Sequence, residues 1–319
     1  MKVLVTGGCG YKGSVLIPLL LDDGHEVVSV DTQWFGNHLP KHPRLTNLRL
    51  DIRDTDAIPI TSVQAVIHLA NIANDPAVEL NPTLSWEVNV LAGQQLADRA
   101  VRAGVKQFIY ASSGSVYGVK KEPNVTEDLT LVPISVYNKT KMVAERVFLS
   151  YADQMQVHCI RPATVCGVSP RMRLDVSVNM LSYQALKNGR ITVFGGDQTR
   201  PNIHIQDICD VYRHFLANPE IASGCYNAGF ENISILDIAE RVKAKIGAEI
   251  VVSESNDPRS YRQDSSKLLA TGFQPNHSVA DAIAEIAESF AQHTLPDGDS
   301  CYTVKWMRHL DLAAPGVTS

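Results

Sequence analysis

The sequence predicts an α/β protein with a doubly wound parallel sheet. Short apolar runs rich in β-branched residues alternate with helical patterns through the first half of the chain, as expected of βαβ units. The runs are continuously apolar, which is typical of strands covered by helices on both faces. A glycine-rich turn joins the first run to the first helical pattern. These three observations predict a Rossmann-type domain.

The expected elements follow in order along this half of the chain. Apolar runs predict strands at residues 2–6, 25–31, 48–52, 65–70, 106–112 and 157–165. Helical patterns lie between them, one ending near Asp22 and others covering residues 86–103 and 136–152. The run at 157–165 is expected to be the sixth parallel strand of the sheet.

The chain changes character after Gly167. Loops containing Pro170 and Pro201 separate shorter elements, and an amphipathic helix is expected at residues 278–292. We expect a Rossmann-type domain at residues 1–167, with its sheet completed by later segments, and a smaller C-terminal lobe at 168–295. The remaining residues, 296–319, are expected to form an irregular tail.

Composition limits the partners that the protein can have. Hydrophobic residues make up 45% of the 319 residues, charged residues 20%, and the formal net charge is −5. This is an ordinary globular composition without the basic excess typical of nucleic-acid binding. No apolar run approaches the roughly 18 residues of a membrane span, and no signal peptide precedes the first strand. We therefore expect a cytoplasmic protein that binds neither nucleic acid nor membrane. The six cysteines lack CxxC spacing, which favours reduced thiols and no metal site.

A phosphate-binding turn follows the first strand. Gly7, Gly10 and Gly13 form a GxxGxxG pattern, in which glycines let the backbone approach a pyrophosphate at the N-terminus of a helix. Asp31 ends the second strand 18 residues after Gly13, near the roughly 20-residue spacing at which a carboxylate bonds the ribose hydroxyls of a dinucleotide. Residues 32–34 supply no arginine for a 2′-phosphate. The pattern predicts NAD rather than NADP as the cofactor.

A second motif, Tyr137-x-x-x-Lys141, lies in the helix expected at 136–152. Residues four apart share one face of a helix. Because an ammonium favours a neighbouring phenolate, we expect Lys141 to lower the pKa of Tyr137 and make it usable for proton transfer. Ser113 follows the preceding strand and is expected to bond the same reacting oxygen. A solvated helical pair is the alternative for the motif taken alone.

Together these motifs resemble the extended short-chain dehydrogenase/reductase family, and within it the nucleotide-sugar epimerases and dehydratases. The resemblance runs from Met1 to about Phe290 and rests on GGCGYKG, Asp31, DIRD, HLA, Asn89, SSGSVYG, YNKTK and RPATVCG. It implies that Tyr137 is the catalytic acid/base, that Lys141 binds the nicotinamide ribose and that Ser113 orients the substrate oxygen. The other cofactor contacts that it implies are Gly7, Gly10, Tyr11, Lys12, Gly13, Asp31, Asp51, Ile52, Leu69, Ala70, Asn89 and Pro162.

The resemblance further implies that the smaller lobe binds a nucleotide-diphosphate sugar. The segment ITVFGGDQTRPNIHIQD resembles the family region in which a strand contacts the base and an arginine, here Arg200, meets the diphosphate. Arginine suits this role because its planar fork bonds paired oxygens. The implied substrate contacts are Ser113, Ser115, Thr164, Asn179, Val193, Arg200 and Arg259. A surface salt bridge is the alternative for each arginine, and a simple strand end the alternative for Ser115.

Departures from the family pattern narrow the reaction. Its dehydratases and sugar-acid decarboxylases use acidic residues just after the catalytic serine or threonine, where this chain has Gly114 and Ser115. The expected activity is NAD-dependent epimerisation of a nucleotide-diphosphate sugar, at C4, through a transient keto intermediate. An NAD(P)H-dependent 4-keto nucleotide-sugar reductase is the alternative, since it needs the same three residues. A dehydratase or a non-catalytic nucleotide-binding protein is less favoured.

Two further expectations concern association and Lys12. The resemblance implies a homodimer formed through the helices around 83–103 and 137–151, where Leu91, Val143, Val147 and Phe148 are apolar. A face buried within the chain would show the same pattern. Lys12 stands where relatives usually carry an apolar residue, and a cation there opposes the helix dipole by roughly 0.3 to 1 kcal/mol. Either it contacts a bound diphosphate or a polar group of the sugar, or its stem packs on the helix with the amino group in water.

Overall fold

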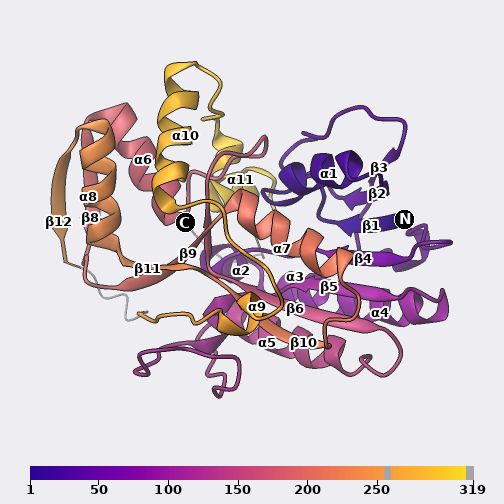
Figure 1. Ribbon diagram of the computed structural model, residues 1–319. Helices are drawn as coiled ribbons and strands as arrows, with labels where there is room; N and C mark the ends of the chain where they lie inside the picture. Colours follow the sequence, from indigo (N-terminus) through magenta and orange to yellow (C-terminus); the bar gives the residue numbers. More distant parts are fainter. Residues whose placement is uncertain (255–259, 314–319) are drawn as a thin grey trace.

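A seven-stranded sheet forms the centre of the protein, in a computed structural model that describes residues 1–254 and 260–313. Its strand order is β10-β6-β5-β4-β1-β2-β3, and every neighbouring pair is parallel (Figure 1). The predicted Rossmann-type sheet is confirmed, and β10, from the second half of the chain, completes it. The strands are β1 (Lys2–Thr6), β2 (Glu26–Asp31), β3 (Leu45–Arg49), β4 (Ala65–His68), β5 (Gln107–Ala111), β6 (Gln156–Pro162) and β10 (Gly224–Ala228).

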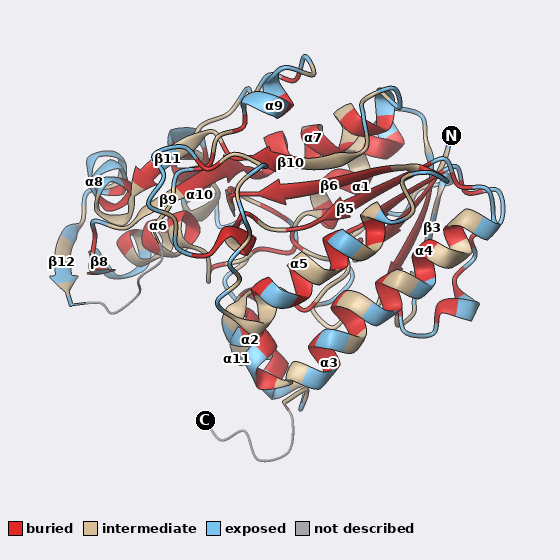
Figure 2. Ribbon diagram, turned by 90° about the horizontal axis from the view of Figure 1, so that it is seen from below, coloured by how far each residue is buried: buried red, intermediate tan, exposed pale blue. Residues whose placement is uncertain are grey.

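Helices cover both faces of the sheet, because successive strand residues point to opposite sides. Val3 and Val5 of β1 share one apolar core with α1 (Gly13–Asp22) and α7 (Ile205–Ala217). Leu4 lies between them in sequence and belongs to the core of the other face, with α4 (Gly93–Arg102) and α5 (Val136–Leu149). Figure 2 shows α3, α4 and α5 across this second face. The continuously apolar strands are thus explained by two covering layers.

The helix expected at residues 86–103 is longer than predicted and is not uniform. It begins with α3 (Pro82–Trp86), continues through a π-helical turn at Glu87–Ala92 and ends with α4. The Asn81 side chain caps its start by accepting from the Leu84 N–H at 3.0 Å. π-Helical turns inside α-helices frequently occur at functional sites, and this turn carries Asn89.

Two predicted strands differ from the observed ones by more than two residues. The third strand covers 45–49 instead of 48–52, because Asp51 begins a turn in which its carbonyl accepts from the Asp54 N–H at 3.1 Å. The run at 157–165 divides into β6 and β7 (Thr164–Cys166). The chain leaves the central sheet after Pro162, and β7 joins a separate sheet of order β11-β9-β7 with β9 (Thr199–His204) and β11 (Glu231–Ser234).

The second lobe has its own apolar core, seen at the left of Figure 1. It combines the parallel pair β8 (Arg190–Phe194) and β12 (Glu249–Ser253) with three helices. These are α6 (Ser177–Asn188), α8 (Ile235–Ile246) and α10 (Val279–Ala291). The predicted amphipathic helix at 278–292 is α10, and Ser278 begins it with a capping box to Asp281.

An irregular tail was expected at residues 296–319, but its described part, residues 296–313, contains helical structure. A 3₁₀ turn at Asp299–Cys301 leads into α11 (Thr303–His309), which packs against α2 (Asp75–Leu80). The Trp306 indole N–H donates to the Trp34 carbonyl at 2.6 Å, and Met307 is buried in the core of the second sheet face. Tertiary contacts therefore order a segment that is too short to form a stable helix by itself.

The remaining short helices are α9 (Ser266–Leu269) and 3₁₀ turns at Thr55–Ala57 and Gly114–Tyr117. Within the ranges 1–254 and 260–313, no helix has both the length and the apolar character that a bilayer span requires. In the same ranges, no three His, Cys, Asp or Glu side chains gather closely enough to bind a metal ion. All six cysteines are free thiols, as predicted, and Cys225 is the one that is partly exposed.

Candidate active site

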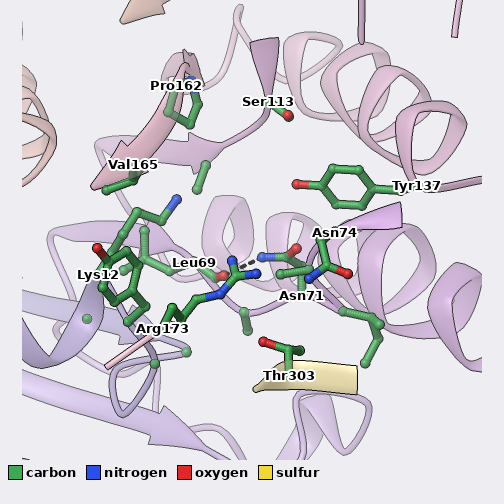
Figure 3. A pocket seen from close by; sticks show the side chains of 18 of the residues that line it. Lys12, Leu69, Asn71, Asn74, Ser113, Tyr137, Pro162, Val165, Arg173 and Thr303 are labelled. Atoms are coloured by element: carbon green, nitrogen blue, oxygen red, sulfur yellow. Dashed lines mark hydrogen bonds between the residues drawn. The ribbon is translucent and has the colours of Figure 1, made fainter. Parts of the chain in front are cut away.

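A cavity of about 370 Å³ lies at the carboxyl ends of β1, β2, β4, β5 and β6, the edge at which parallel α/β sheets usually bind ligands. The structure brings most of the sequence-predicted site residues to its wall. In Figure 3 the Ser113 and Tyr137 hydroxyls, the Lys12 amino group and the Arg173 guanidinium face the same space. The predicted residues that line it are Gly7, Gly10, Tyr11, Lys12, Gly13, Asp31, Asp51, Ile52, Leu69, Ala70, Ser113, Ser115, Tyr137, Lys141, Pro162, Thr164 and Arg200.

The glycine turn is shaped so closely that side chains would not fit. Gly7 has a φ of +73°, and a Cβ built on it would lie 2.6 Å from the Ala70 nitrogen. A Cβ on Gly13 would lie 2.5 Å from the Gly8 carbonyl oxygen. The turn thus leaves bare backbone at the N-terminus of α1, which suits a pyrophosphate.

Asp31 is held in place at the far end of this turn. Its two carboxylate oxygens accept from the Cys9 N–H at 3.0 Å and the Gln33 N–H at 2.6 Å. Burial raises the pKa of Asp31, and these N–H groups and the charge of Arg171 oppose the rise. The glycine cradle and this oriented carboxylate fit the pyrophosphate and the adenosine ribose of NAD.

Arg171 is an unpredicted cation at the same end. It stacks 4.0 Å from the centroid of the Phe35 ring, and burial lowers its pKa to about 10. Its Nε atom is buried with no hydrogen-bond partner among the described residues. The only sequence signal was a pair of arginines, SPRMR, in the loop after the sixth strand.

The three predicted catalytic residues lie together at the other end of the cavity. Ser113 follows β5, and its hydroxyl contacts both the Ser115 hydroxyl, at 2.8 Å, and Tyr137. Tyr137 and Lys141 lie one turn apart on α5, whose start is capped by Ser135. Lys141 is buried, and its ammonium lies 5.9 Å from the centroid of the Tyr137 ring.

The expected lowering of the Tyr137 pKa is not the net effect. Burial raises the pKa of Tyr137 to about 12, and the contact with Ser113 only partly opposes the rise. The Lys141 amino group donates to the Ala111 carbonyl at 2.7 Å. Burial and the nearby Lys12 ammonium lower the pKa of Lys141 well below its ordinary value. The spacing predicted the neighbourhood correctly, but the sequence does not reveal how deeply the pair is buried.

Three predicted residues lie away from the cavity wall. Asn89 is buried and holds the Ile72 backbone by two hydrogen bonds of 2.7 and 3.2 Å, so it shapes the loop after β4. Asn179 accepts from the Gly167 N–H at 3.0 Å and donates to the Tyr11 hydroxyl. Val193 is fully buried in the core of the second lobe. The predicted contact at Arg259 lies outside the described residues.

A second cavity of about 880 Å³ adjoins the first. Arg173, Arg200 and Thr164 line both cavities, and Lys305 and Arg308 of the C-terminal segment line the second. Arg173 pairs with Asp175 at 2.8 Å. Cations outnumber the carboxylates of Asp75 and Asp175 in its lining, so this space beside the predicted catalytic residues suits an anionic ligand such as a diphosphate.

Other wall residues were also missed by sequence reasoning. Thr303 and Met307 of α11 line the first cavity, and the expectation of an irregular tail concealed them. Asp75 lines both cavities and accepts from Ser135 and Asn138. It places a carboxylate near Tyr137 although the chain lacks an acidic pair after Ser113, and an ordinary helix start gave no signal for it.

Fold and site together define a class of enzyme that couples a bound dinucleotide to a tyrosine positioned for proton transfer. Residues 3–229 match the NAD dependent epimerase/dehydratase family. The chain belongs to this family, and it is an NAD-dependent enzyme of the extended short-chain dehydrogenase/reductase class.

Individual relatives span several reactions. The chain is 28% identical to a UDP-glucose 4-epimerase of Lactobacillus helveticus, over 89% of this chain and 95% of that one. It is 26% identical to UDP-glucuronic acid decarboxylase 1 of Danio rerio, over 95% and 76%. It superposes with a TM-score of 0.80 on UDP-glucuronic acid 4-epimerase from Bacillus cereus, solved with UDP-glucuronic acid and NAD, at 27% identity over 92% of this chain and 100% of that one.

Proposed function

We propose that the protein epimerises a nucleotide-diphosphate sugar at C4 through a transient keto intermediate. One observation carries the proposal: Ser113, Tyr137 and Lys141 lie at one end of the cofactor cavity, beside the second, cation-lined cavity. A single proton-transfer tyrosine suits a reaction that removes and returns the same proton. Relatives that act on UDP-sugars at C4 support the choice of substrate class.

The chain's own residues would divide the work as follows. The Tyr137 oxygen accepts the proton of the C4 hydroxyl, because the positive charge of bound NAD⁺ would favour the phenolate that burial disfavours, and Ser113 holds that hydroxyl by a hydrogen bond. NAD, bound by the glycine turn, Asp31 and Lys141, supplies the hydride acceptor. Arg173 and Arg200 hold the diphosphate while the keto sugar turns its other face to the site. Tyr137 then returns the proton to the oxygen as the hydride would return from the reduced cofactor to the other face of C4, so the protein ends the cycle unchanged.

The test is to incubate the purified protein separately with UDP-glucose and UDP-glucuronic acid. Sugar products are identified by NMR, and the reduced cofactor is followed by absorbance. We expect inversion at C4 in one of the two sugars with no net NADH accumulation, and no inversion with Tyr137→Phe. Net consumption or accumulation of NADH would identify a 4-keto sugar reductase instead, and loss of water a dehydratase.

We also propose a homodimer through the outer face of α3, α4 and α5. Trp86 and Leu91 are large apolar residues that are 38% and 53% exposed on this face, and Val147 is half-buried nearby. Phe148, expected in the interface, is instead fully buried within the chain. Light scattering after gel filtration should give a dimer mass, and Leu91→Glu should give a monomer. A monomeric parent protein would refute the dimer.

A further inference from the structure

Lys12 presents a cation inside the cofactor cavity. Its amino group faces the cavity (Figure 3) and donates to the Tyr212 hydroxyl at 3.1 Å. Tyr212 belongs to α7 and is fully buried. Lys12 is also the N-cap residue of α1, but its side chain makes no capping bond. The alternative in which the Lys12 amino group lies in water is therefore wrong, because a buried hydroxyl binds it.

The surroundings of this ammonium do not neutralise it. Among the residues that the structure describes, Lys12 makes no ion pair with a carboxylate. The neighbouring charged groups are Arg173, from the loop after β7, and Lys141, from α5, and both are cations. From α7, the Tyr212 hydroxyl accepts from the ammonium, and Cys209 lies close to it. Burial lowers the pKa of Lys12 to about 8. Holding three cations close together in a partly buried site costs free energy, unless a bound ligand gains from the Lys12 charge.

The reaction requires the nicotinamide ring of the cofactor to lie at the end of the cavity where Lys12 is found. Oxidation of a carbinol removes the hydroxyl proton and the carbon-bound hydride from adjacent atoms, so the hydride acceptor ring must lie beside the Tyr137 hydroxyl. In Figure 3 the Lys12 amino group and the Tyr137 hydroxyl face the same space, and the charge of Lys12 helps to lower the pKa of Lys141. The Lys12 ammonium thus acts at the reacting end of the cavity.

We propose that Lys12 is a cofactor-tuning cation that makes the site favour NADH over NAD⁺. When the sugar carbinol gives a hydride to the nicotinamide ring and its hydroxyl proton to Tyr137, the carbinol becomes a ketone. The ring accepts two electrons and loses its positive charge. A nearby cation repels the charged ring but not the neutral one. Lys12 therefore favours the oxidation step and retains the reduced cofactor while the keto sugar is in the site.

This inference rests on two parts of the proposed function, NAD as cofactor and Tyr137 as the proton-transfer group. It does not depend on epimerisation. The experiment therefore contains no sugar. Holoenzyme is equilibrated with mixtures of NAD⁺ and NADH at a fixed total concentration, free cofactor is removed, and the bound NADH fraction is measured by nicotinamide fluorescence. The ratio of the two dissociation constants follows from the titration.

We expect Lys12→Met to shift this ratio towards NAD⁺ by about tenfold or more, with little change in NADH affinity. Lys12→Gln keeps a hydrogen-bond donor for Tyr212 but removes the charge, so it should give the same shift. This variant replaces Lys12→Met in the titration if Lys12→Met is unstable. Lys106→Met removes one charge from an exposed position and should leave the ratio unchanged.

Two results would overturn the proposal. An equal loss of affinity for both forms would show that Lys12 binds the pyrophosphate, which NAD⁺ and NADH share. No change in the affinity for NAD⁺ or for NADH would show that Lys12 does not interact with the cofactor. Because sugar turnover is not measured, neither result bears on the epimerase assay, and failure of that assay leaves this inference intact.

Discussion

The two ends of the active site are built in different ways. The end with Ser113, Tyr137 and Lys141, the proposed catalytic end, is held by a buried polar network, in which Glu145, one turn after Lys141, forms a pair with Arg161 at 2.8 Å. Ser112 donates to the same carboxylate at 2.6 Å, and Arg161 donates to the Tyr117 hydroxyl at 2.7 Å. The end proposed to bind the diphosphate, called the diphosphate end, is formed mainly by Arg173 on a loop and by the C-terminal helix α11, with Arg200 from β9.

Because of this difference, one set of residues would carry out the reaction and another set would determine which ligand binds. Residues on strands and on α5 fix the atoms that move protons, as accurate positioning requires. Residues on loops and on the chain end determine what can bind beside them, and such segments vary without disturbing the framework. The comparison predicts that changes at the catalytic end affect turnover or folding, whereas changes at the other end affect binding.

The largest effect is expected from Tyr137→Phe. The ring keeps its packing but loses the hydroxyl that contacts Ser113 and faces the cavity, so kcat should fall by about 10² to 10⁴. Steady-state kinetics on the sugar product measures the loss. NAD content of the purified variant should match the parent, because the hydroxyl makes no contact with the glycine cradle. Retained activity would transfer the acid/base role to another residue.

The next effect tests the buried framework. Glu145→Gln leaves Arg161 charged in an interior where its side chain is 5% exposed, and the free energy of unfolding should fall by about 3 to 5 kcal/mol. Urea unfolding followed by circular dichroism measures it. The matched control is Asp299→Asn, which breaks an ion pair with Lys305 whose side chains are 63% and 62% exposed; less than about 1 kcal/mol is expected. If both variants lose the same free energy of unfolding, the buried network stabilises the protein no more than an exposed ion pair does.

The third prediction concerns the diphosphate end. Arg173→Met removes a cation that lines both cavities, so KM for the nucleotide sugar should rise about tenfold while kcat changes little. Arg190→Met, which removes a cation that is 57% exposed on β8, should leave both constants unchanged. A large fall in kcat with an unchanged KM would place Arg173 with the catalytic cluster and break the comparison.

The sequence predicted which residues gather at the proposed catalytic end, because its signals are local. Glycine spacing, an acidic strand end and Tyr137-x-x-x-Lys141 each depend on a few consecutive turns of chain, and local geometry brings them to one edge of a parallel sheet. Burial depends on the whole fold. The raised pKa of Tyr137 and the Tyr212 hydroxyl that holds Lys12 across 200 residues are therefore not visible in local patterns.

The diphosphate end was predicted only in part for the same reason. Arg200 was found through a family segment, but Arg173, Thr303 and Arg308 reach the cavity from segments far apart in sequence. The tail lacked the length and periodicity that identify a helix. Its order comes from contacts with residues near the start of the chain, which no window of the sequence contains.

The smallest expected effect tests this contact directly. Trp306 joins α11 to the loop after β2 through its bond to the Trp34 carbonyl, 272 residues away, and Trp34 and Met307 line the cofactor cavity. Trp306→Phe keeps an aromatic ring but removes the donor, a loss of about 0.5 to 1.5 kcal/mol. NAD should then dissociate about twofold to tenfold faster, measured by exchange of bound for labelled NAD. Asp311→Asn changes an exposed residue just after the same helix, which lines neither cavity, and should leave the rate unchanged. If Trp306→Phe also leaves it unchanged, α11 only covers the site, and the difference between the two ends reduces to the arginines alone.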